Sequence, residues 1–226
     1  AQRSQRLLQG LYYEVIRLST KAIDSGELAD SEAAVAYSDR GLAQWYKGNH
    51  DRAIADCSRA IALNSKLVVA YNNRGLALDD QGKFDRAILD YSAALRLDPR
   101  YSSAYNNRGF SHANKGDYDL AIADYTQAIH LDPKSRLAYK NRASAHARKG
   151  DNDLAIQDNT KCIELNPGDD VAWHNRGCAY DDTGEYDRAI RDFDKAIELN
   201  PKDPVTYSRR GLAYKHKGDM ERSAAD

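Results

Sequence analysis

Glycine returns every 34 residues along most of this chain, and this spacing limits the folds that the sequence can adopt. The recurring glycines are Gly48, Gly82, Gly116, Gly150, Gly184 and Gly218. The same step separates the prolines Pro99, Pro133, Pro167 and Pro201. A fixed period of this length indicates stacked copies of one supersecondary unit rather than a single globular core.

Each repeat is predicted to contain two helices. Residues 69–81 carry small or apolar side chains at every third or fourth position, so these lie on one face of a helix. Gly82 ends that segment, residues 84–97 form a second amphipathic helix, and Pro99 stops it. One such hairpin cannot bury its own apolar face, so successive hairpins must stack into a solenoid. The expected fold class is therefore all-α.

The repeat resembles the tetratricopeptide repeat family closely. The matching residues of the second repeat are Tyr71, Gly75, Leu78, Ala87, Tyr91, Ala94 and Pro99, and those of the fifth are Trp173, Gly177, Tyr180, Ala189, Phe193, Ala196 and Pro201. The resemblance implies a right-handed α-α superhelix of 34-residue helix-turn-helix units, in which the first helix of each hairpin lines a concave groove. It also implies a non-catalytic scaffold that binds a peptide or protein partner.

The predicted organisation is one terminal segment followed by six repeats in register. The repeats are 34–67, 68–101, 102–135, 136–169, 170–203 and 204–226, the last of them truncated. Residues 1–33 are expected to hold a half-repeat or capping helix, because STKAI at 19–23 resembles CSRAI at 57–61. Since the sixth repeat stops within its second helix, we expect the chain to be a fragment or the binding domain of a larger protein.

An arginine recurs at the seventh position of every repeat, where the family more often has leucine. The helical step places this side chain on the inward face, and an unpaired charge there would be costly. An aspartate recurs at the twenty-third position, on the second helix. We therefore predict a structural ion pair inside each hairpin, with ligand binding by the arginine as the weaker alternative. The pairs are Arg40–Asp56, Arg74–Asp90, Arg108–Asp124, Arg142–Asp158 and Arg176–Asp192, with Arg210–Asp226 in the truncated repeat.

An asparagine occupies the sixth position of four repeats, on the side of the first helix that faces the groove. These residues are Asn73, Asn107, Asn141 and Asn175. A carboxamide both donates and accepts hydrogen bonds, so such a row can hold an extended peptide by its backbone. The row is similar to the asparagine ladder in the superhelix of O-linked sugar transferases. The alternative is that each asparagine only caps or solvates an exposed helix face.

Lys140 and Arg209 add positive charge to the groove of the later repeats. Together with Asn175 they match three places of a clamp by which some family members hold a partner's C-terminal carboxylate. Ser144 and Val205 stand where that clamp requires asparagine and lysine. These departures make the clamp a minor alternative to peptide binding along the row.

The fourth repeat departs most from the pattern. Ala143 replaces the glycine, His146 takes a core position, and Asn159 and Cys162 stand where other repeats have aromatic or alanine residues. A buried polar group without a partner costs roughly 1–3 kcal/mol. We therefore predict a local irregularity or a flexible joint over residues 143–165.

Composition excludes several function classes. Lys and Arg number 33 against 34 Asp and Glu, which gives no bias toward nucleic acid or an anionic membrane. No apolar run approaches the roughly 20 residues that span a bilayer. Phosphate-loop and metal-ligand spacings are missing, and Cys178, on the groove face, is expected to be a passive thiol. We expect no enzymatic activity, cofactor, metal site or membrane insertion.

The sequence leaves two alternatives for the function and two for the cellular localisation. The chain is expected to bind a protein or peptide partner in its groove, or alternatively to self-assemble into a homo-oligomer through its edges or its incomplete last hairpin. Localisation is cytoplasmic or, if a signal peptide was removed before Ala1, periplasmic or secreted.

Overall fold

The structure is a computed structural model that describes residues 2–224, with side chains from Gln9 onward. Thirteen helices and no strand occupy this described part, which confirms the all-α prediction. None of these helices is both long enough and apolar enough to cross a membrane. The chain divides into two compact parts, Ala1–Gly116 and Asp117–Asp226, and each is described by itself.

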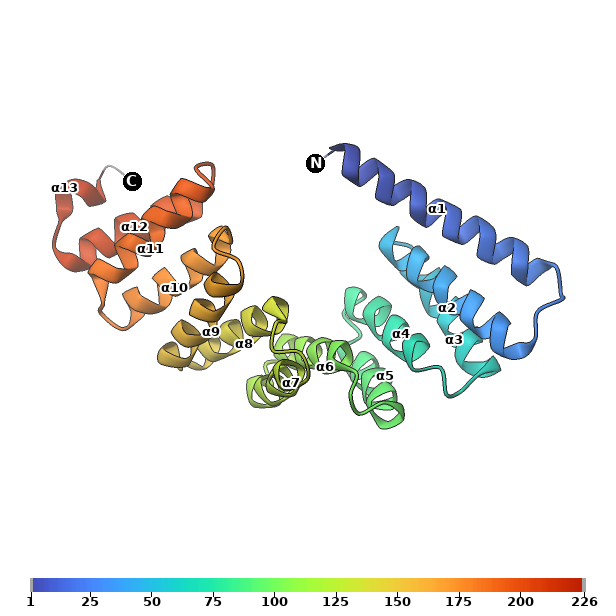
Figure 1. Cartoon of the computed structure of the whole chain (residues 1–226). Coiled ribbons are helices and arrows are strands. Elements are labelled where there is room, and N and C mark those ends of the chain that lie inside the picture. The colour runs from blue at the N-terminus through green and yellow to red at the C-terminus, as the bar shows by residue number, and fades with distance from the viewer. Residues whose placement is uncertain (1, 225–226) are drawn as a thin grey trace. The chain divides into compact units, whose positions relative to one another are not determined.

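The N-terminal part contains the helices α1 to α6 (Figure 1). Their bounds are α1 Gln2–Asp24, α2 Asp30–Tyr46, α3 His50–Leu63, α4 Val68–Asp80, α5 Phe84–Leu97 and α6 Ser102–Lys115. Each helix packs on the next one along the chain, and α4 also contacts α2 and α6. The first helices α2, α4 and α6 therefore form one layer, on which α3 and α5 pack.

The C-terminal part contains α7 to α13. Their bounds are α7 Tyr118–Leu131, α8 Arg136–Lys149, α9 Asn152–Leu165, α10 Asp170–Asp182, α11 Tyr186–Leu199, α12 Pro204–Lys217 and α13 Met220–Ser223. Here too each helix packs on its successor, and α10 contacts α12. The two helices of the third repeat, α6 and α7, belong to different parts.

The turn after each first helix requires a left-handed backbone. The recurring glycines Gly48, Gly82, Gly116, Gly150, Gly184 and Gly218 have φ angles of 77°, 69°, 86°, 82°, 81° and 91°. At the end of α4, the N–H of Lys83 donates to the carbonyl of Leu78 at 2.9 Å and so closes the helix. A side chain would strain this conformation, so the turn geometry accounts for the glycine spacing.

The core of a hairpin joins a glycine on the first helix to a ring on the second. A Cβ atom added to Gly75 would stand 2.5 Å from the ring of Tyr91, which is fully buried. Gly177 and Phe193 repeat this arrangement, with a corresponding distance of 2.8 Å. The absence of a side chain at the glycine makes room for the ring.

The fourth hairpin replaces both partners of that contact but keeps a regular backbone. Helices α8 and α9 each have 14 residues and are unbroken. The prediction of a local irregularity over residues 143–165 is therefore wrong for these helices, while a flexible joint stays a prediction. Ala143 and Asn159 are both buried, and the change in side-chain volume leaves a cavity instead of a break in a helix.

Candidate functional site

The recurring arginine lies between its own hairpin and the preceding helix. In the second repeat, Arg74 Nε and Nη2 donate to the two carboxylate oxygens of Asp90, both at 2.7 Å. Arg74 Nη1 donates to Ser58 Oγ of α3 at 3.1 Å. The two charged side chains keep only 23% and 9% of their surface exposed. The guanidinium thus binds inside the protein with all three of its nitrogens.

The same two-pronged pair occurs in three further repeats. These pairs are Arg40–Asp56, Arg142–Asp158 and Arg176–Asp192. Arg108 and Asp124 belong to different parts of the chain, so their pairing stays a prediction. Asp226 lies outside the described residues, and Arg210 donates to Asp194 of α11 at 2.6 Å.

The third contact of each arginine was not foreseen from the sequence. For five arginines its acceptor is a hydroxyl on the preceding helix, from Thr20, Ser58, Ser92, Thr126 or Thr160, and for Arg210 it is the carboxylate of Asp194. From Ser58 onward these residues recur at the 34-residue step, which is the signal that could have revealed them. Thr20 of α1 accepts a hydrogen bond from Arg40, as Ser58 of α3 does from Arg74. Helix α1 therefore takes the place that the second helix of the preceding repeat has elsewhere.

The asparagines of the sixth position differ in their exposure. Asn73 keeps only 7% of its surface, and its Nδ2 donates to Ser38 Oγ of α2 at 3.3 Å. Its amide thus bridges two first helices and has little accessible surface, and its part in peptide binding stays a prediction. Asn107 is half-buried and donates to Asn72 Oδ1 at 3.0 Å.

The asparagines of the C-terminal part retain accessible surface. Asn141 on α8 and Asn175 on α10 are half-buried, as is Lys140, and Arg209 on α12 is exposed. All four residues lie on first helices of consecutive repeats. A role for them in peptide binding therefore stays a proposal that their exposure permits.

Apolar side chains at the second position of the repeat are exposed on the same helices. Val35, Val69, Leu137, Val171 and Val205 keep 46%, 42%, 54%, 46% and 56% of their surface. At the ninth position, Phe110 and Leu212 keep 45% and 37%. In each of the two parts, we call the surface of the first helices that carries these residues the first-helix face. Isolated exposed apolar residues are ordinary, but here they return at one repeat position.

A buried acid in the second repeat joins three helices. Asp79 of α4 is 8% exposed and accepts hydrogen bonds from the hydroxyl of Tyr91 at 2.8 Å and from Ser111 Oγ at 2.6 Å. Burial raises the pKa of Asp79 to about 6, although both hydrogen bonds lower it. The network packs α4, α5 and α6 together within the N-terminal part.

A small cavity of about 120 Å³ opens between α8, α9 and α10. Asn159 and Asn175 are among its lining residues, and so is Cys178. Burial raises the pKa of the Cys178 thiol to about 11, so this thiol is protonated at neutral pH. Within residues 2–224, no group of three or more His, Cys, Asp and Glu side chains is placed to hold a metal ion.

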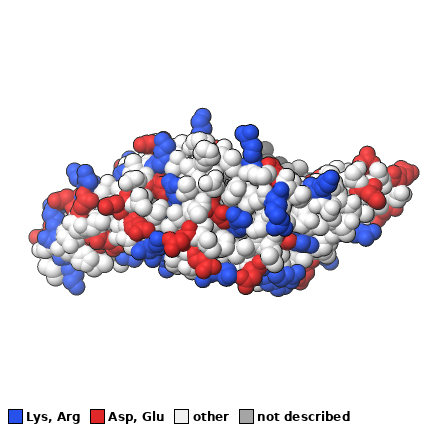
Figure 2. Space-filling model, turned by 90° about the horizontal axis from the view of Figure 1, so that it is seen from below, with Lys and Arg blue, Asp and Glu red and all other residues white. Residues whose placement is uncertain are grey.

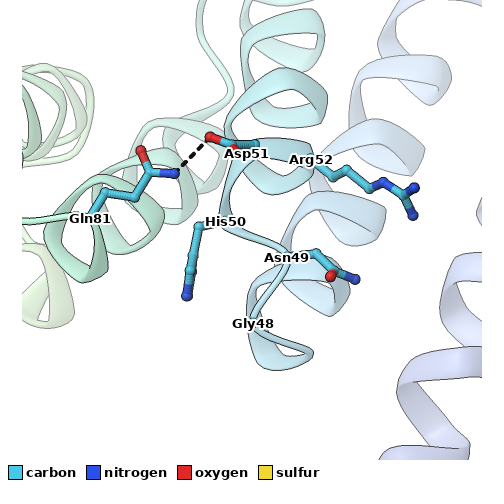
Figure 3. Close-up of a pocket in the computed structure, with 6 residues that line it drawn as sticks. All are labelled: Gly48, Asn49, His50, Asp51, Arg52 and Gln81. Atoms are coloured by element: carbon cyan, nitrogen blue, oxygen red, sulfur yellow. Dashed lines mark hydrogen bonds between the residues drawn. The ribbon is translucent and has the colours of Figure 1, made fainter.

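A wider hollow of about 400 Å³ lies at the turn between α2 and α3 (Figure 3). Gln81 Nε2 donates to Asp51 Oδ1 at 2.8 Å across it. The side chains of His50 and Arg52 point in different directions in Figure 3, so the lining residues do not converge on one point. The hollow therefore lacks the converging polar groups that bind a small ligand.

Charge is mixed over the surface. Basic and acidic side chains alternate over the face seen in Figure 2. This agrees with the near balance of 33 basic and 34 acidic residues in the sequence. The face shown thus favours neither a strongly acidic nor a strongly basic partner.

Models of the tetratricopeptide repeat match five stretches of the sequence. These are residues 34–67, 68–101, 102–135, 138–169 and 171–203. The chain belongs to the tetratricopeptide repeat family. Its periodicity, its turn glycines and its helical hairpins all agree with this assignment, and the prediction of the family is confirmed.

Several solved structures resemble this tetratricopeptide repeat chain. One structure of MamA is 30% identical with a TM-score of 0.64, and the match covers 67% of this chain and 88% of MamA. YrrB, described as a TPR protein with an unusual peptide-binding site, is 23% identical with a TM-score of 0.68 and coverages of 83% and 95%. PilF of Pseudomonas aeruginosa is 18% identical with a TM-score of 0.76 and coverages of 88% and 90%. YrrB and PilF therefore show the fold alone. Curated protein sequences give no match to the chain.

Proposed function

We propose that this chain is a non-catalytic scaffold that binds an extended peptide or protein segment along its first-helix face. The observation that carries the proposal is the return of exposed apolar side chains at the second position of the repeat. In the C-terminal part these are Leu137, Val171 and Val205, each about half exposed. Burial of such side chains against a partner releases the water that covers them and favours binding.

Polar groups beside this apolar row would align the bound segment. Asn141 and Asn175 are half-buried, so less side-chain entropy is lost when they bind than for a fully mobile residue. Their carboxamides can donate to and accept from a peptide backbone irrespective of its side chains. Lys140 and Arg209 would add attraction to a carboxylate of the partner.

The family supports this function in general terms, and the printed description of YrrB names a peptide-binding site in a protein of the same fold. The recurring arginines do not contribute to the proposed surface, because their nitrogens bind Asp90 and Ser58 or the equivalent residues. The partner would instead contact residues at the second, sixth and ninth positions.

The test begins with peptides selected from a random library on the immobilised chain. The variant Asn141→Ala/Asn175→Ala should weaken their binding by about tenfold or more, because it removes two hydrogen-bonding groups. The matched control is Leu120→Ala/Leu154→Ala, which alters side chains on α7 and α9 that are 54% and 43% exposed. The control should change the dissociation constant less than about twofold.

Circular dichroism of both variants should match that of the parent chain. Equal affinity of the parent chain and the asparagine variant would contradict the proposal, as would an equal loss in the control. Light scattering over a range of concentrations tests self-assembly separately. A strict monomer would contradict that alternative and leave peptide binding as the function.

A further inference from the structure

The cavity of the fourth repeat stands where the second repeat has a filled core. In the 34-residue register, Tyr91, Asp79 and Ser111 correspond to Asn159, Ala147 and Ala179. The first three form the buried hydrogen-bonded network of the N-terminal part. Asn159, Ala147 and Ala179 all line the cavity of about 120 Å³. The cavity therefore marks the place of a missing phenol ring and its polar partners.

The size of this cavity suits one aromatic ring. Helices α8 and α9 keep the regular form of the other hairpins, so the backbone has not closed over the lost volume. An engineered cavity of about 150 Å³ in another protein binds benzene, which sets the scale for a single ring. The methyl groups of Ala143, Ala147 and Ala179 provide apolar walls of the kind that such a ring packs against.

One hydrogen-bond acceptor of the lining has a defined orientation. Asn159 is 2% exposed, and its Nδ2 donates to the carbonyl of Ala155 at 2.9 Å. This bond fixes the amide and leaves Oδ1, a buried atom with no hydrogen-bond partner among the described residues. Asn152 also lines the cavity, and its buried Oδ1 likewise has no hydrogen-bond partner among the described residues. An occupant that donates a hydrogen bond would remove the cost of such an unpaired acceptor.

The entrance lies on the first-helix face. Ser144 and Asp182 are exposed lining residues on α8 and α10, and Asn175 of the proposed binding row is half-buried beside them. A segment bound along that face would therefore pass the opening. Asp182 is charged but exposed, so the buried part of the lining offers neutral groups.

We propose that this cavity binds a tyrosine side chain of the partner segment, with its ring among the alanines and its hydroxyl donating to Asn159 Oδ1. The proposal rests on the proposed function, because it places the bound segment on the same face. A phenylalanine would leave the acceptor unpaired. A lysine would bring its ammonium group to neutral oxygens while the carboxylate of Asp182 stays near solvent, and burial of a charge is costly.

The test uses p-cresol, the isolated side chain of tyrosine, on the whole chain. Titration is followed by amide ¹H–¹⁵N spectra, with toluene and n-butylammonium as the two comparison compounds. We expect saturable shifts confined to residues around the cavity, and binding of p-cresol at least about fivefold tighter than that of toluene. Binding of butylammonium tighter than that of p-cresol would overturn the proposal.

Two variants assign the binding to the cavity. Asn159→Leu replaces the acceptor with an apolar side chain of similar shape, so the preference for p-cresol over toluene should disappear. Ala143→Gly/Asn159→Tyr restores the glycine and ring of the second repeat and should abolish binding of both compounds. Gln157→Ala, on the exposed side of α9, is the matched control and should leave binding unchanged. Equal binding of p-cresol to the parent chain and the ring-restored variant would overturn the proposal.

These experiments distinguish a failure of the tyrosine site from a failure of the proposed scaffold function. Library peptides that bind the first-helix face but lack tyrosine would overturn the tyrosine site and still support the scaffold. Conversely, saturable p-cresol binding in a chain that selects no peptide would support the site and contradict the scaffold. A cavity that holds only water would show no saturable shift with any of the three compounds, and this result would also overturn the proposal.

Discussion

The second and fourth hairpins both consist of two unbroken helices but fill their cores differently. In the second, Gly75 admits the ring of Tyr91, whose hydroxyl binds Asp79. In the fourth, the methyl of Ala143 and the amide of Asn159 leave a cavity. The exchange at the glycine and the exchange at the ring belong together, because a Cβ at Gly75 would stand 2.5 Å from the Tyr91 ring.

This difference teaches that a repeat can lose its central ring without losing its hairpin. The ion pair is common to both hairpins, since Arg142 binds Asp158 at 2.7 and 2.8 Å much as Arg74 binds Asp90. What differs is the core contact between the two helices, which is Gly75 against Tyr91 in the second hairpin and Ala143 against Asn159 in the fourth. Four predictions test how far the two hairpins differ and what they share.

The largest effect is expected when the second hairpin is given the asparagine of the fourth. Tyr91→Asn removes a fully buried ring and leaves Asp79 with Ser111 alone of its two hydroxyl donors. The free energy of unfolding in urea should fall by about 3–5 kcal/mol. Leu89→Ala on the same helix, where the side chain is 69% exposed, should cost less than about 0.5 kcal/mol. A loss below about 1 kcal/mol for Tyr91→Asn would contradict the comparison.

The next effect tests what the two hairpins share. Arg74→Leu and Arg142→Leu each leave an aspartate that is almost buried without its ion partner, so each should cost about 2–4 kcal/mol. The two losses should agree within about 1 kcal/mol, as read from urea unfolding. Arg74→Leu/Asp90→Leu should recover most of the loss, because no charge is left unpaired. A neutral or stabilising Arg74→Leu would show that the pair is not effectively buried.

The buried acid should give the second hairpin a pH dependence that the fourth lacks, since Ala147 replaces Asp79 in register. The pKa of Asp79 is raised by burial to about 6, so the folded chain binds this proton more tightly than the unfolded chain. Stability from this group is therefore present at low pH and is lost as pH rises through about 6. The free energy of unfolding of the parent chain, relative to Asp79→Asn, should rise by about 2 kcal/mol between pH 7.5 and 4.5. A difference that is constant with pH would exclude a raised pKa.

The smallest effect concerns the fourth hairpin made to resemble the second. Asn159→Tyr alone should destabilise the chain, because Ala143 corresponds to Gly75, where a Cβ would stand 2.5 Å from the ring of Tyr91. Ala143→Gly alone should cost about 1 kcal/mol through lost helix propensity. Together the two changes should stabilise the chain by about 1–2 kcal/mol, with thermal unfolding as the measurement. Additive losses would mean that the glycine and the ring are not coupled.

The hairpins were predictable from the sequence because their determinants are local. The turn glycines, the helix-ending prolines and the apolar spacing act within one repeat. The Arg74–Asp90 pair was predictable as well, since a charge on the inward face needs an opposite charge and the second helix carries one at a fixed place. These inferences need only the period of an α-helix and the cost of burial.

The parts that escaped prediction depend on neighbouring repeats. A helical projection gives the direction of Asn73 but not the distance to Ser38 on the adjacent helix, so its burial was missed. The acceptor Ser58 lies on a different hairpin from Arg74 for the same reason. The substitutions at Ala143 and Asn159 were noticed, but whether they bend a helix or leave a cavity depends on how the fifth repeat packs.

The third hydrogen bond of each arginine has a consequence for how such a chain can change length. Its acceptor belongs to the preceding helix, and Ser58, Ser92, Thr126 and Thr160 are chemically equivalent hydroxyls, while Asp194 supplies a carboxylate to Arg210. Deletion of residues 68–101 would place Ser58 on the helix before Arg108. Arg108 would then again have a hydroxyl acceptor on the preceding helix. Duplication of a whole repeat would keep the contact equally intact. The spacing can also vary within a connection, because Thr20 lies 20 residues before Arg40 whereas Ser58 lies 16 residues before Arg74. Gains and losses of whole repeats are thus length changes that preserve this contact.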